Sequence, residues 1–271
     1  MAVKWVDRVP TRANRVLVTP EDGSTPYYAT ITRADEPSVV GTPVNAANLN
    51  AMQDAAGLTT HKTVYVATTG SDTTGTGTQA APFATINKAL ASIPKNLNGY
   101  SATINVAAGT YPEKVSITNF GNGTLKITGT VGETATISGL FVANVRYLEI
   151  SSLALNLTNS YLEASCSNVC VYSPFSVNGG TNGVYASVAS NVLFFSTVTI
   201  SNTTSYGVVS TSASKVYIAT LAGTGNRMNV ACTLGGVCVL GVDSSTTSGT
   251  QYFTDTGGRI LAGSQTQIPN Y

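Results

Sequence analysis

Short segments of alternating apolar and polar residues recur along the second half of the chain. Four of them align: NVRYLEISSLAL begins at Asn144, NVCVYSPFSVNG at Asn168, NVLFFSTVTISN at Asn191 and KVYIATLAGTGN at Lys215. Their starts are 24, 23 and 24 residues apart, a length that three short strands and their turns would fill. The segments are rich in Ser, Thr and Val, which favours strands over helices. The repeat therefore predicts a right-handed parallel β-helix from about residue 61 to the mid-240s.

Superposing the segments predicts which side chains stack. One inward column is expected to contain Val145, Val169, Val192 and Val216, and a second, two positions along, Tyr147, Val171, Phe194 and Ile218. A turn column of Asn144, Asn168 and Asn191 would hydrogen-bond along the stack until Lys215 interrupts it. A preceding strand recurs 24 residues apart, as Gly183–Ala186 and as Gly207–Ser210.

The first sixty residues have a different pattern, with more charge and more proline. Arg15–Thr19 and Tyr27–Thr32 are predicted strands on either side of the turn residues Pro20–Gly23. Thr42 and Pro43 would start a short helix with a narrow apolar stripe of Val44, Leu49, Met52 and Ala56. Such a helix is marginal alone, so its stripe is expected to pack on the hairpin or on copies of itself.

Both ends of an open stack need covering. A helix near residues 82–93 is the candidate cap for the first end, because Phe83, Ile86, Ala89, Leu90 and Ile93 recur at helical spacing. The polar tail from Ser244 to Tyr271 is the candidate for the second end. We therefore expect three parts: an attachment and oligomerisation module in residues 1–60, the β-helix in 61–244 and a C-terminal cap in 245–271.

The composition narrows the classes of function. Of 271 residues, 42% are hydrophobic, only 10% are charged and 26 are Gly, which favours a mostly β protein. A net charge of +1 leaves no cluster of cations for nucleic acid or for an anionic membrane. We expect no nucleic-acid partner and no membrane insertion, since no apolar run has the length of a membrane span or of a signal peptide.

The cysteines do not have the spacing of a metal site. Cys166 and Cys170 form one local pair, Cys232 and Cys238 another, and the single histidine, His61, is distant. Buried free cysteines are therefore favoured over zinc or a disulfide. We predict no metal and no cofactor.

Carboxylates are too scattered to predict a catalytic residue. From residue 113 onward the acids are Glu113, Glu133, Glu149, Glu163, Asp243 and Asp255. In the repeat register Glu149 would stack with Ser173, Ser196 and Thr220, and Glu163 with Ala186 and Ser210. Glu149 is expected to pair with Arg146, and Asp72 to support a turn rather than to bind calcium. An active site formed by carboxylates from two subunits remains an alternative.

Tyrosines are the remaining candidates for binding. Four of them, which could stack on sugar rings along one face of the β-helix, are Tyr161, Tyr172, Tyr185 and Tyr206. Packing in the core or between subunits is the alternative interpretation of the same residues.

Residues 64–111 carry a resemblance to a known superfamily. Val64–Val66, Gly70–Asp72, Ala81–Ile86 and Gly109–Tyr111 resemble the opening of pectin lyase-like β-helix proteins. That superfamily includes lyases, hydrolases, esterases and structural proteins, so the resemblance implies the fold and not the activity.

The segments KWVDRVP from Lys4, Asn14–Arg15, Tyr27–Thr30 and GTPVNAANLN from Gly41 resemble the N-terminal part of phage tail-fibre and baseplate-associated proteins. This resemblance implies a homotrimeric tail appendage of the virion, assembled in the cytoplasm of the bacterial host. Attachment to tail or baseplate proteins would involve Trp5, Asp7, Arg8, Asn14 and Arg15. The implied function is host-surface attachment, with a surface glycan as a possible partner. The alternative is a tailspike that depolymerises such a glycan as a lyase or glycoside hydrolase.

Overall fold

The computed structural model divides the chain into two compact units, Met1–Ala56 and Gly57–Tyr271. It describes residues 15–18, 27–30, 57–246, 251–262 and 266–267. In the first unit, β1 (Arg15–Val18) and β2 (Tyr27–Thr30) pair antiparallel, with Arg15 opposite Thr30, which confirms the two predicted strands. The helix expected after Pro43 and the attachment residues Trp5, Asp7, Arg8 and Asn14 lie outside the described residues.

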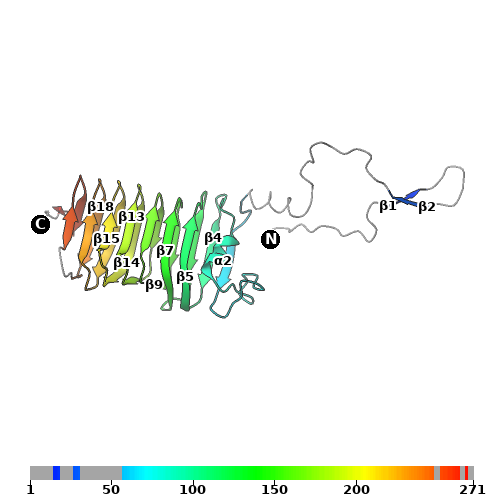
Figure 1. The fold of residues 1–271 in the computed structure, drawn as a ribbon, viewed down its shortest axis with the longest axis horizontal. Helices are drawn as coiled ribbons and strands as arrows, with labels where there is room; N and C mark the ends of the chain where they lie inside the picture. Colours follow the sequence, from blue (N-terminus) through cyan, green and yellow to red (C-terminus); the bar gives the residue numbers. More distant parts are fainter. Residues whose placement is uncertain (1–14, 19–26, 31–56, 247–250, 263–265, 268–271) are drawn as a thin grey trace. The chain divides into compact units, whose positions relative to one another are not determined.

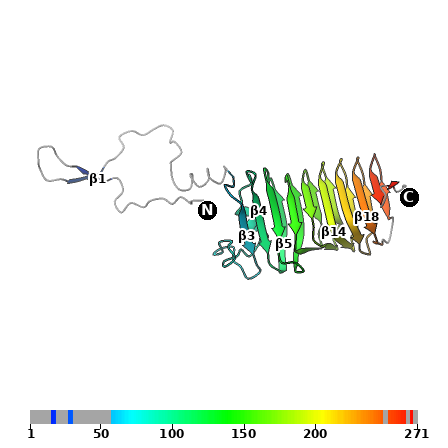
Figure 2. The same cartoon turned by 180° about the vertical axis from the view of Figure 1, so that it is seen from behind.

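The second unit is a parallel β-solenoid of about seven turns, which confirms the predicted parallel β-helix. Figures 1 and 2 show its strands stacked side by side along one axis. Each turn passes through three faces, here called A, B and C, and neighbouring strands on a face are hydrogen-bonded in parallel. The core fills the space that the three faces enclose.

The strands divide among the faces as follows. Face A contains β3 (Lys62–Val66), β4 (Ser101–Val106), β6 (Thr124–Thr128), β8 (Leu148–Ser151), β11 (Asn168–Val171), the first parts of β14 (Asn191–Ser201), β16 (Lys215–Ala222) and β18 (Val237–Asp243), and β20 (Arg259–Ala262). Face B contains the first parts of β5 (Gly109–Thr118) and β7 (Thr134–Ala143), then β9 (Ala154–Thr158), β12 (Phe175–Asn178) and the later parts of β14, β16 and β18. Face C contains the later parts of β5 and β7, then β10 (Leu162–Ser165), β13 (Asn182–Ser187), β15 (Tyr206–Ser210), β17 (Met228–Cys232) and β19 (Tyr252–Thr254).

The predicted inward columns are confirmed over three turns. Val169 pairs with Val192 and Val192 with Val216, while Phe194 lies between Val171 and Ile218. All of these side chains are buried. The Gly183 and Gly207 strands are also in the predicted register, since Val184 pairs with Val208 and Ala186 with Ser210.

The prediction is wrong for the Asn144 segment. Leu148 and Ile150, not Val145 and Tyr147, pair with Val169 and Val171. The reason is that Leu148 and Ile150 alternate with polar residues just as well, so the apolar pattern allowed two registers. Consequently this turn of the solenoid is 21 residues long, measured from Leu148 to Val169.

The asparagine column is shortened by the same shift. The Nδ2 of Asn191 donates to Oδ1 of Asn168 at 2.8 Å, as predicted. Asn144 instead donates from its Nδ2 to Oδ1 of Asn119 at 3.3 Å, one turn earlier. Asn144 therefore belongs to a different column.

The columns predicted for the two acids are also wrong. Glu149 pairs with Cys170 rather than with Ser173. Glu163 pairs with Tyr185 rather than with Ala186, because an error of one residue transfers a side chain to the opposite face of a strand.

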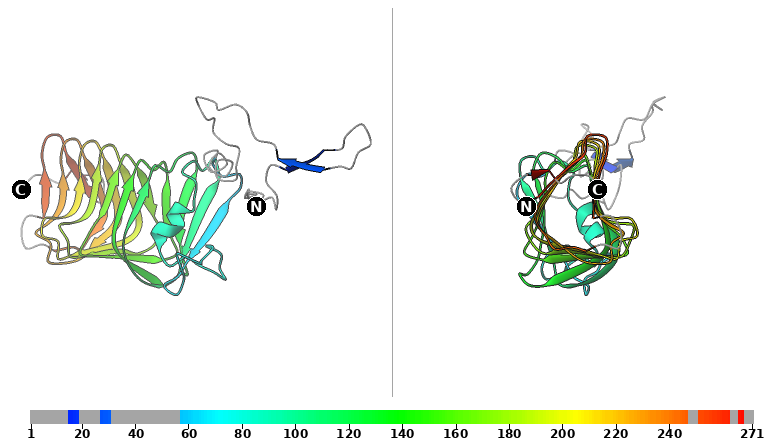
Figure 3. Two further views of the ribbon diagram at one scale, coloured as in Figure 1. Left: turned by 45° about the vertical axis from the view of Figure 1, so that its right-hand side comes forward. Right: turned by 90° about the vertical axis from the view of Figure 1, so that its left-hand side faces the viewer.

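The first end of the core is closed by α2 (Ile86–Ala91), which is shorter than the helix predicted from residues 82–93. Figure 3 shows α2 against the first strands. Thr85 caps it, since its Oγ1 accepts from the backbone N–H of Lys88 at 3.1 Å. Ile86, Ala89 and Leu90 are buried in the core cluster, so the helix contributes its apolar stripe to the solenoid.

Buried serines line the turns between face C and face A. The backbone N–H of Ser167 donates to Oγ of Ser190 at 3.3 Å, and that of Ser190 donates to Oγ of Ser214 at 3.1 Å. All three side chains are buried. The hydroxyls thereby satisfy backbone groups that the turns leave without a strand partner.

At the other end, the parallel stack continues beyond residue 244. β19 pairs with β17, and β20 pairs with β18. The short β21 (Thr266–Gln267) then runs antiparallel to β20 and covers part of its edge.

Cys170, Cys232 and Cys238 are buried and free, as predicted, but Cys166 is exposed. It occupies a turn with a φ of 47°, where the side chain cannot enter the core.

Within the described part of the chain, no helix is long and apolar enough to cross a membrane.

Two adjacent phenylalanines test the inward column. Phe194 is 1% exposed and packs against Phe175 with ring centroids 5.2 Å apart, whereas Phe195 is 49% exposed. Phe194→Ala should destabilise the solenoid by about 3–5 kcal/mol, because it removes core contacts and leaves a cavity. The matched control Phe195→Ala should cost about 1 kcal/mol or less. Guanidinium unfolding followed by circular dichroism measures both, and equal losses would contradict the assigned register.

Candidate functional site

Two carboxylates accept hydrogen bonds from residues at the start of α2. Asp72 accepts hydrogen bonds from the backbone N–H of Ala84 at 2.8 Å and of Thr85 at 3.1 Å, and from the Thr85 hydroxyl at 2.6 Å. Glu113 accepts from the N–H groups of Ile86 at 2.6 Å and Asn87 at 3.0 Å. These bonds satisfy donors that a helix start leaves free. Asp72 therefore supports the local structure, as expected, although it acts on a helix rather than on its own turn.

The hydrogen bonds also change the ionisation of Asp72. Desolvation by burial is the largest single contribution and would raise its pKa. The bonds from the Thr85 hydroxyl and from the N–H groups of Ala84 and Thr85, with the nearby charge of Lys88, outweigh it and hold the pKa below the ordinary value of 3.8. The ionised carboxylate is thus the form that the fold stabilises.

Glu149 and Asp243 also have partners. Glu149 forms an ion pair with Lys126, one turn earlier, at 3.2 Å. Asp243 accepts from the backbone N–H of Ser245 at 2.9 Å and from the Tyr252 hydroxyl at 2.7 Å. Burial, followed by the hydrogen bond to Asp243 and its charge, raises the pKa of Tyr252 to about 12. These contacts tie neighbouring turns and the C-terminal segments together.

The expected pair between Glu149 and Arg146 is wrong. Arg146 lies in the turn before β8 (Leu148–Ser151) and not on the strand of Glu149, whereas a residue one turn away lies only about 4.8 Å distant on the same face. Lys126 stands directly beside Glu149 in the register of face A and so becomes its partner.

Two of the four candidate tyrosines meet on face C. Glu163 stands between Phe141 on one neighbouring strand and Tyr185 on the other. Tyr161 is hydrogen-bonded to Glu163, and burial together with the charge of Glu163 raises the pKa of Tyr161. All of these side chains are half-buried.

A lysine completes this group. The Nζ of Lys114 lies 5.6 Å from the ring centroid of Phe141 and 6.0 Å from that of Tyr161. Lys114, Phe141, Tyr161, Glu163 and Tyr185 are called the face C cluster below. It combines aromatic rings with one carboxylate and one ammonium group on a rigid sheet, a combination that can pack on the apolar side of a sugar and bond its hydroxyls.

Tyr172 belongs to a different surface. On face A, its ring stacks on that of Phe195, with centroids 5.0 Å apart and planes 11° apart, and Phe195 contacts Tyr217 at 5.9 Å. The side chain of Tyr147 is hydrogen-bonded to Cys170 and to Tyr172, which raises its pKa well above the ordinary value. Because Tyr172 and Phe195 stack on each other, one face of each ring is covered in this group, which is called the face A ladder below. It is a poorer platform for a sugar than the face C cluster.

Tyr206 is separate from both groups. It pairs with Asn182 and Met228 at the start of β15. It stands two residues before the buried Val208 and so on the same side of the strand. The structure thus brings together Tyr161 and Tyr185 but not Tyr172 or Tyr206. Arg15, the one attachment candidate among the described residues, lies in β1.

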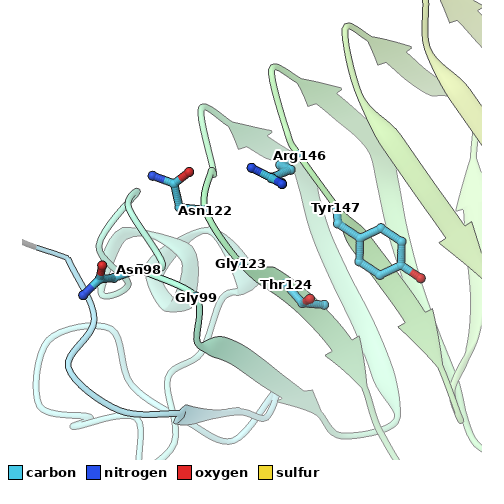
Figure 4. A pocket seen from close by; sticks show the side chains of 7 residues that line it. All are labelled: Asn98, Gly99, Asn122, Gly123, Thr124, Arg146 and Tyr147. Carbon is cyan, nitrogen blue, oxygen red and sulfur yellow. The ribbon is translucent and has the colours of Figure 1, made fainter.

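A polar groove opens at the edge where face C turns into face A. Its volume is about 500 Å³. In Figure 4 the Arg146 guanidinium extends toward Asn122, while Tyr147 points away toward the following turns. The polar side-chain groups at the groove are amide, hydroxyl and guanidinium, and the lining residues are Asn98, Gly99, Asn122, Gly123, Thr124, Arg146 and Tyr147.

Sequence reasoning missed the face C cluster and the groove. Glu163 was placed one residue out of register, which separated it from Tyr185, and Arg146 was assigned to Glu149. Two separate corrections would have been needed: Leu148 in place of Val145 opposite Val169, and a shift of one residue that brings Glu163 beside Tyr185.

Comparison with known proteins adds no relative. No protein-family model, no curated protein and no solved structure matches the chain.

The contribution of Asp72 to the stability of the solenoid should depend on pH. Because its folded pKa is lower than its unfolded pKa, its contribution is fully present above about pH 3.8 and is lost as the pH falls through the lower folded value. Asp72→Asn should destabilise the solenoid by about 1 kcal/mol near neutral pH, since it loses the bond to the Thr85 hydroxyl. The difference from the natural chain should shrink on acidification.

Denaturant unfolding at a series of pH values between about 6 and 3 measures this effect. Asp255→Asn is the matched control, because Asp255 is exposed on a turn. A penalty for Asp72→Asn that stays constant with pH would contradict the role of the ionised cap.

Proposed function

We propose that the protein is a structural appendage of a phage tail, joined to the tail through residues 1–60, and that its solenoid binds a glycan on the bacterial surface. The resemblance of the first sixty residues to tail-fibre and baseplate-associated proteins supports the attachment. The division of the chain after Ala56 into two compact units supports a separate module there.

The observation that carries the glycan assignment is the face C cluster. Glu163 lies between aromatic residues on both neighbouring strands, so the rings of Phe141 and Tyr185 are not stacked on each other in that column. Ring surface, a carboxylate acceptor and the Lys114 ammonium donor are therefore within reach of one bound sugar. Because Lys114, Phe141, Glu163 and Tyr185 stand on hydrogen-bonded strands, with Tyr161 directly before β10, little conformational entropy is lost on binding.

Binding is favoured over cleavage by the positions of the carboxylates. Glycoside hydrolysis uses two carboxyl groups on either side of one bond. Here Asp72 and Glu113 cap α2, Glu149 pairs with Lys126, and Asp243 bonds Ser245 and Tyr252. Glu163 is the carboxylate in the face C cluster and hydrogen-bonds Tyr161.

Substitutions on face C test the proposal. The full-length chain should sediment with purified, protein-free bacterial cell walls, and Tyr161→Ala and Tyr185→Ala should each weaken this binding by about tenfold, since each removes ring contact. Tyr172→Ala is the matched control and should bind normally, because Tyr172 stands in the face A ladder.

A measurement of new reducing ends in the same mixtures separates binding from depolymerisation. Absence of binding to cell walls from a broad panel of bacteria would contradict host-surface attachment. Equal losses for Tyr161→Ala and Tyr172→Ala would contradict the face C assignment.

The implied homotrimer has its own test. Mass photometry of the full-length chain should give three times the 27.9 kDa of the chain. A monomer across the accessible concentration range would contradict a trimeric appendage.

A further inference from the structure

A second surface, on the edge between face C and face A, has a different chemistry. Arg146, Asn168, Asn191 and Lys215 occupy neighbouring positions on four successive turns. Asn168 pairs with Asn191 and Asn191 with Lys215 in the register of face A. Asn168 joins Arg146 from the other side, where its Nδ2 donates to the Arg146 carbonyl at 2.9 Å. These four residues are called the cationic edge below.

The amides between the two cations are held in place by one another. Asn191 donates to Oδ1 of Asn168 at 2.8 Å, so both side chains point along the stack. The Oδ1 of Asn191 accepts from no described residue and is left as an acceptor at the Lys215 end. Each Nδ2 also carries a second N–H that the ladder does not use. The edge therefore offers both donors and acceptors in fixed positions.

The charges of the edge are uncompensated within the described residues. Arg146 and Lys215 are exposed, and neither has a carboxylate partner there. Glu149, the acid nearest to Arg146 in sequence, is engaged by Lys126. A guanidinium and an ammonium group on one edge, without an acid between them, favour an oxyanion ligand.

The polar groove lies at the Arg146 end of this edge. Its volume of about 500 Å³ falls within the range of small-ligand sites, about 300–1,000 Å³. Asn98, Asn122 and Thr124 line it and supply amide and hydroxyl groups beside the guanidinium. Such a lining suits a polyhydroxylated unit that carries one negative charge.

We propose that the cationic edge and its groove bind an extended anionic glycan that lies parallel to the solenoid axis. One anionic unit occupies the groove against Arg146, the following units bond the Asn168–Asn191 ladder, and another anionic group meets Lys215. The negative group is an oxyanion, either a carboxylate or a phosphodiester. This site is separate from the face C cluster and does not depend on it.

The spacing of the two cations sets the length of the ligand. Three steps of the stack separate Arg146 from Lys215, which corresponds to about 14 Å at about 4.8 Å per strand. The bound chain must therefore span more than one sugar unit, and a single acidic sugar should bind far more weakly than a polymer. The exposed aromatic side chains Tyr172 and Phe195 lie toward the other end of face A, outside the edge, which favours a polar ligand over an aromatic protein interface.

Binding to defined polymers tests the inference with the full-length chain. Biolayer interferometry would use immobilised polygalacturonate and poly(glycerol phosphate) as the two anionic polymers, with neutral dextran and an oligothymidylate for comparison. We expect binding to at least one of the anionic glycans, weaker binding to dextran and to the oligothymidylate, and a loss of affinity with rising salt. The preferred anionic polymer identifies whether carboxylate or phosphodiester is the recognised group.

Three charge-neutralising variants locate the site. Arg146→Gln and Lys215→Gln should each weaken binding by about fivefold or more, since each removes one charge-assisted contact. Lys88→Gln makes the same charge change on the exposed side of α2 and should bind normally. Tyr185→Ala, which impairs the face C cluster, should also bind the anionic polymer normally.

Several outcomes would overturn the inference. Equal affinity for dextran would remove the role of charge, and tighter binding of the oligothymidylate would make the edge a nucleic-acid site. If Lys88→Gln and Arg146→Gln weakened binding equally, the binding would depend on the net charge of the protein and not on the cationic edge. Loss of binding with Tyr185→Ala alone would move the site to face C, whereas normal polymer binding with failed cell-wall binding would contradict only the function proposed above.

Discussion

The structure depends on one constraint, the parallel hydrogen bonding of each strand to the equivalent strand one turn away. This bonding satisfies the backbone and places each side chain about 4.8 Å from its counterpart. Any residue type that repeats therefore becomes a ladder, and a ladder of like charges is destabilising. The low charge of the chain, 10% of residues, follows from this constraint. Where a charge occurs in a column of the described strands, its neighbour is opposite or neutral, as with Lys126 beside Glu149 and Lys215 beside Asn191.

The same bonding overrides local conformational preference at the turns. Val188 and Ala189 both adopt positive φ, 52° and 55°, although a β-branched residue rarely does so. The turn is held there because the N–H of Ala189 donates to the Ser212 carbonyl at 2.9 Å and the N–H of Cys166 donates to the Val188 carbonyl at 3.1 Å. Strain of this kind persists only where the neighbouring turns fix the backbone on both sides.

The sequence was sufficient for the fold because a period of 23–24 residues and alternating apolar positions are compatible with few architectures. It was not sufficient for the register of every turn. Between Asn144 and Ile150 the apolar residues permit two alignments, and the choice depends on how the preceding turn packs, which no local pattern records. The face C cluster depended on a second register, in which a shift of one residue separates Glu163 from Tyr185. The role of Glu113 at the start of α2 could not be predicted for another reason. Glu113 is 27 residues from Ile86 in the sequence, so no local pattern connects the two.

Regular repetition and candidate function occupy different columns of the solenoid. Where a column repeats one residue type, its groups satisfy each other: Tyr172 and Phe195 cover each other's ring faces, and the buried serines bond successive turns. Such columns stabilise the stack and leave for a ligand only those groups that the column itself does not use. Where a column changes residue type, groups stay available, as with Glu163 between aromatic residues and with Lys215 at the end of the asparagine ladder. In this solenoid, departures from the repeat are therefore the positions at which binding chemistry should be sought.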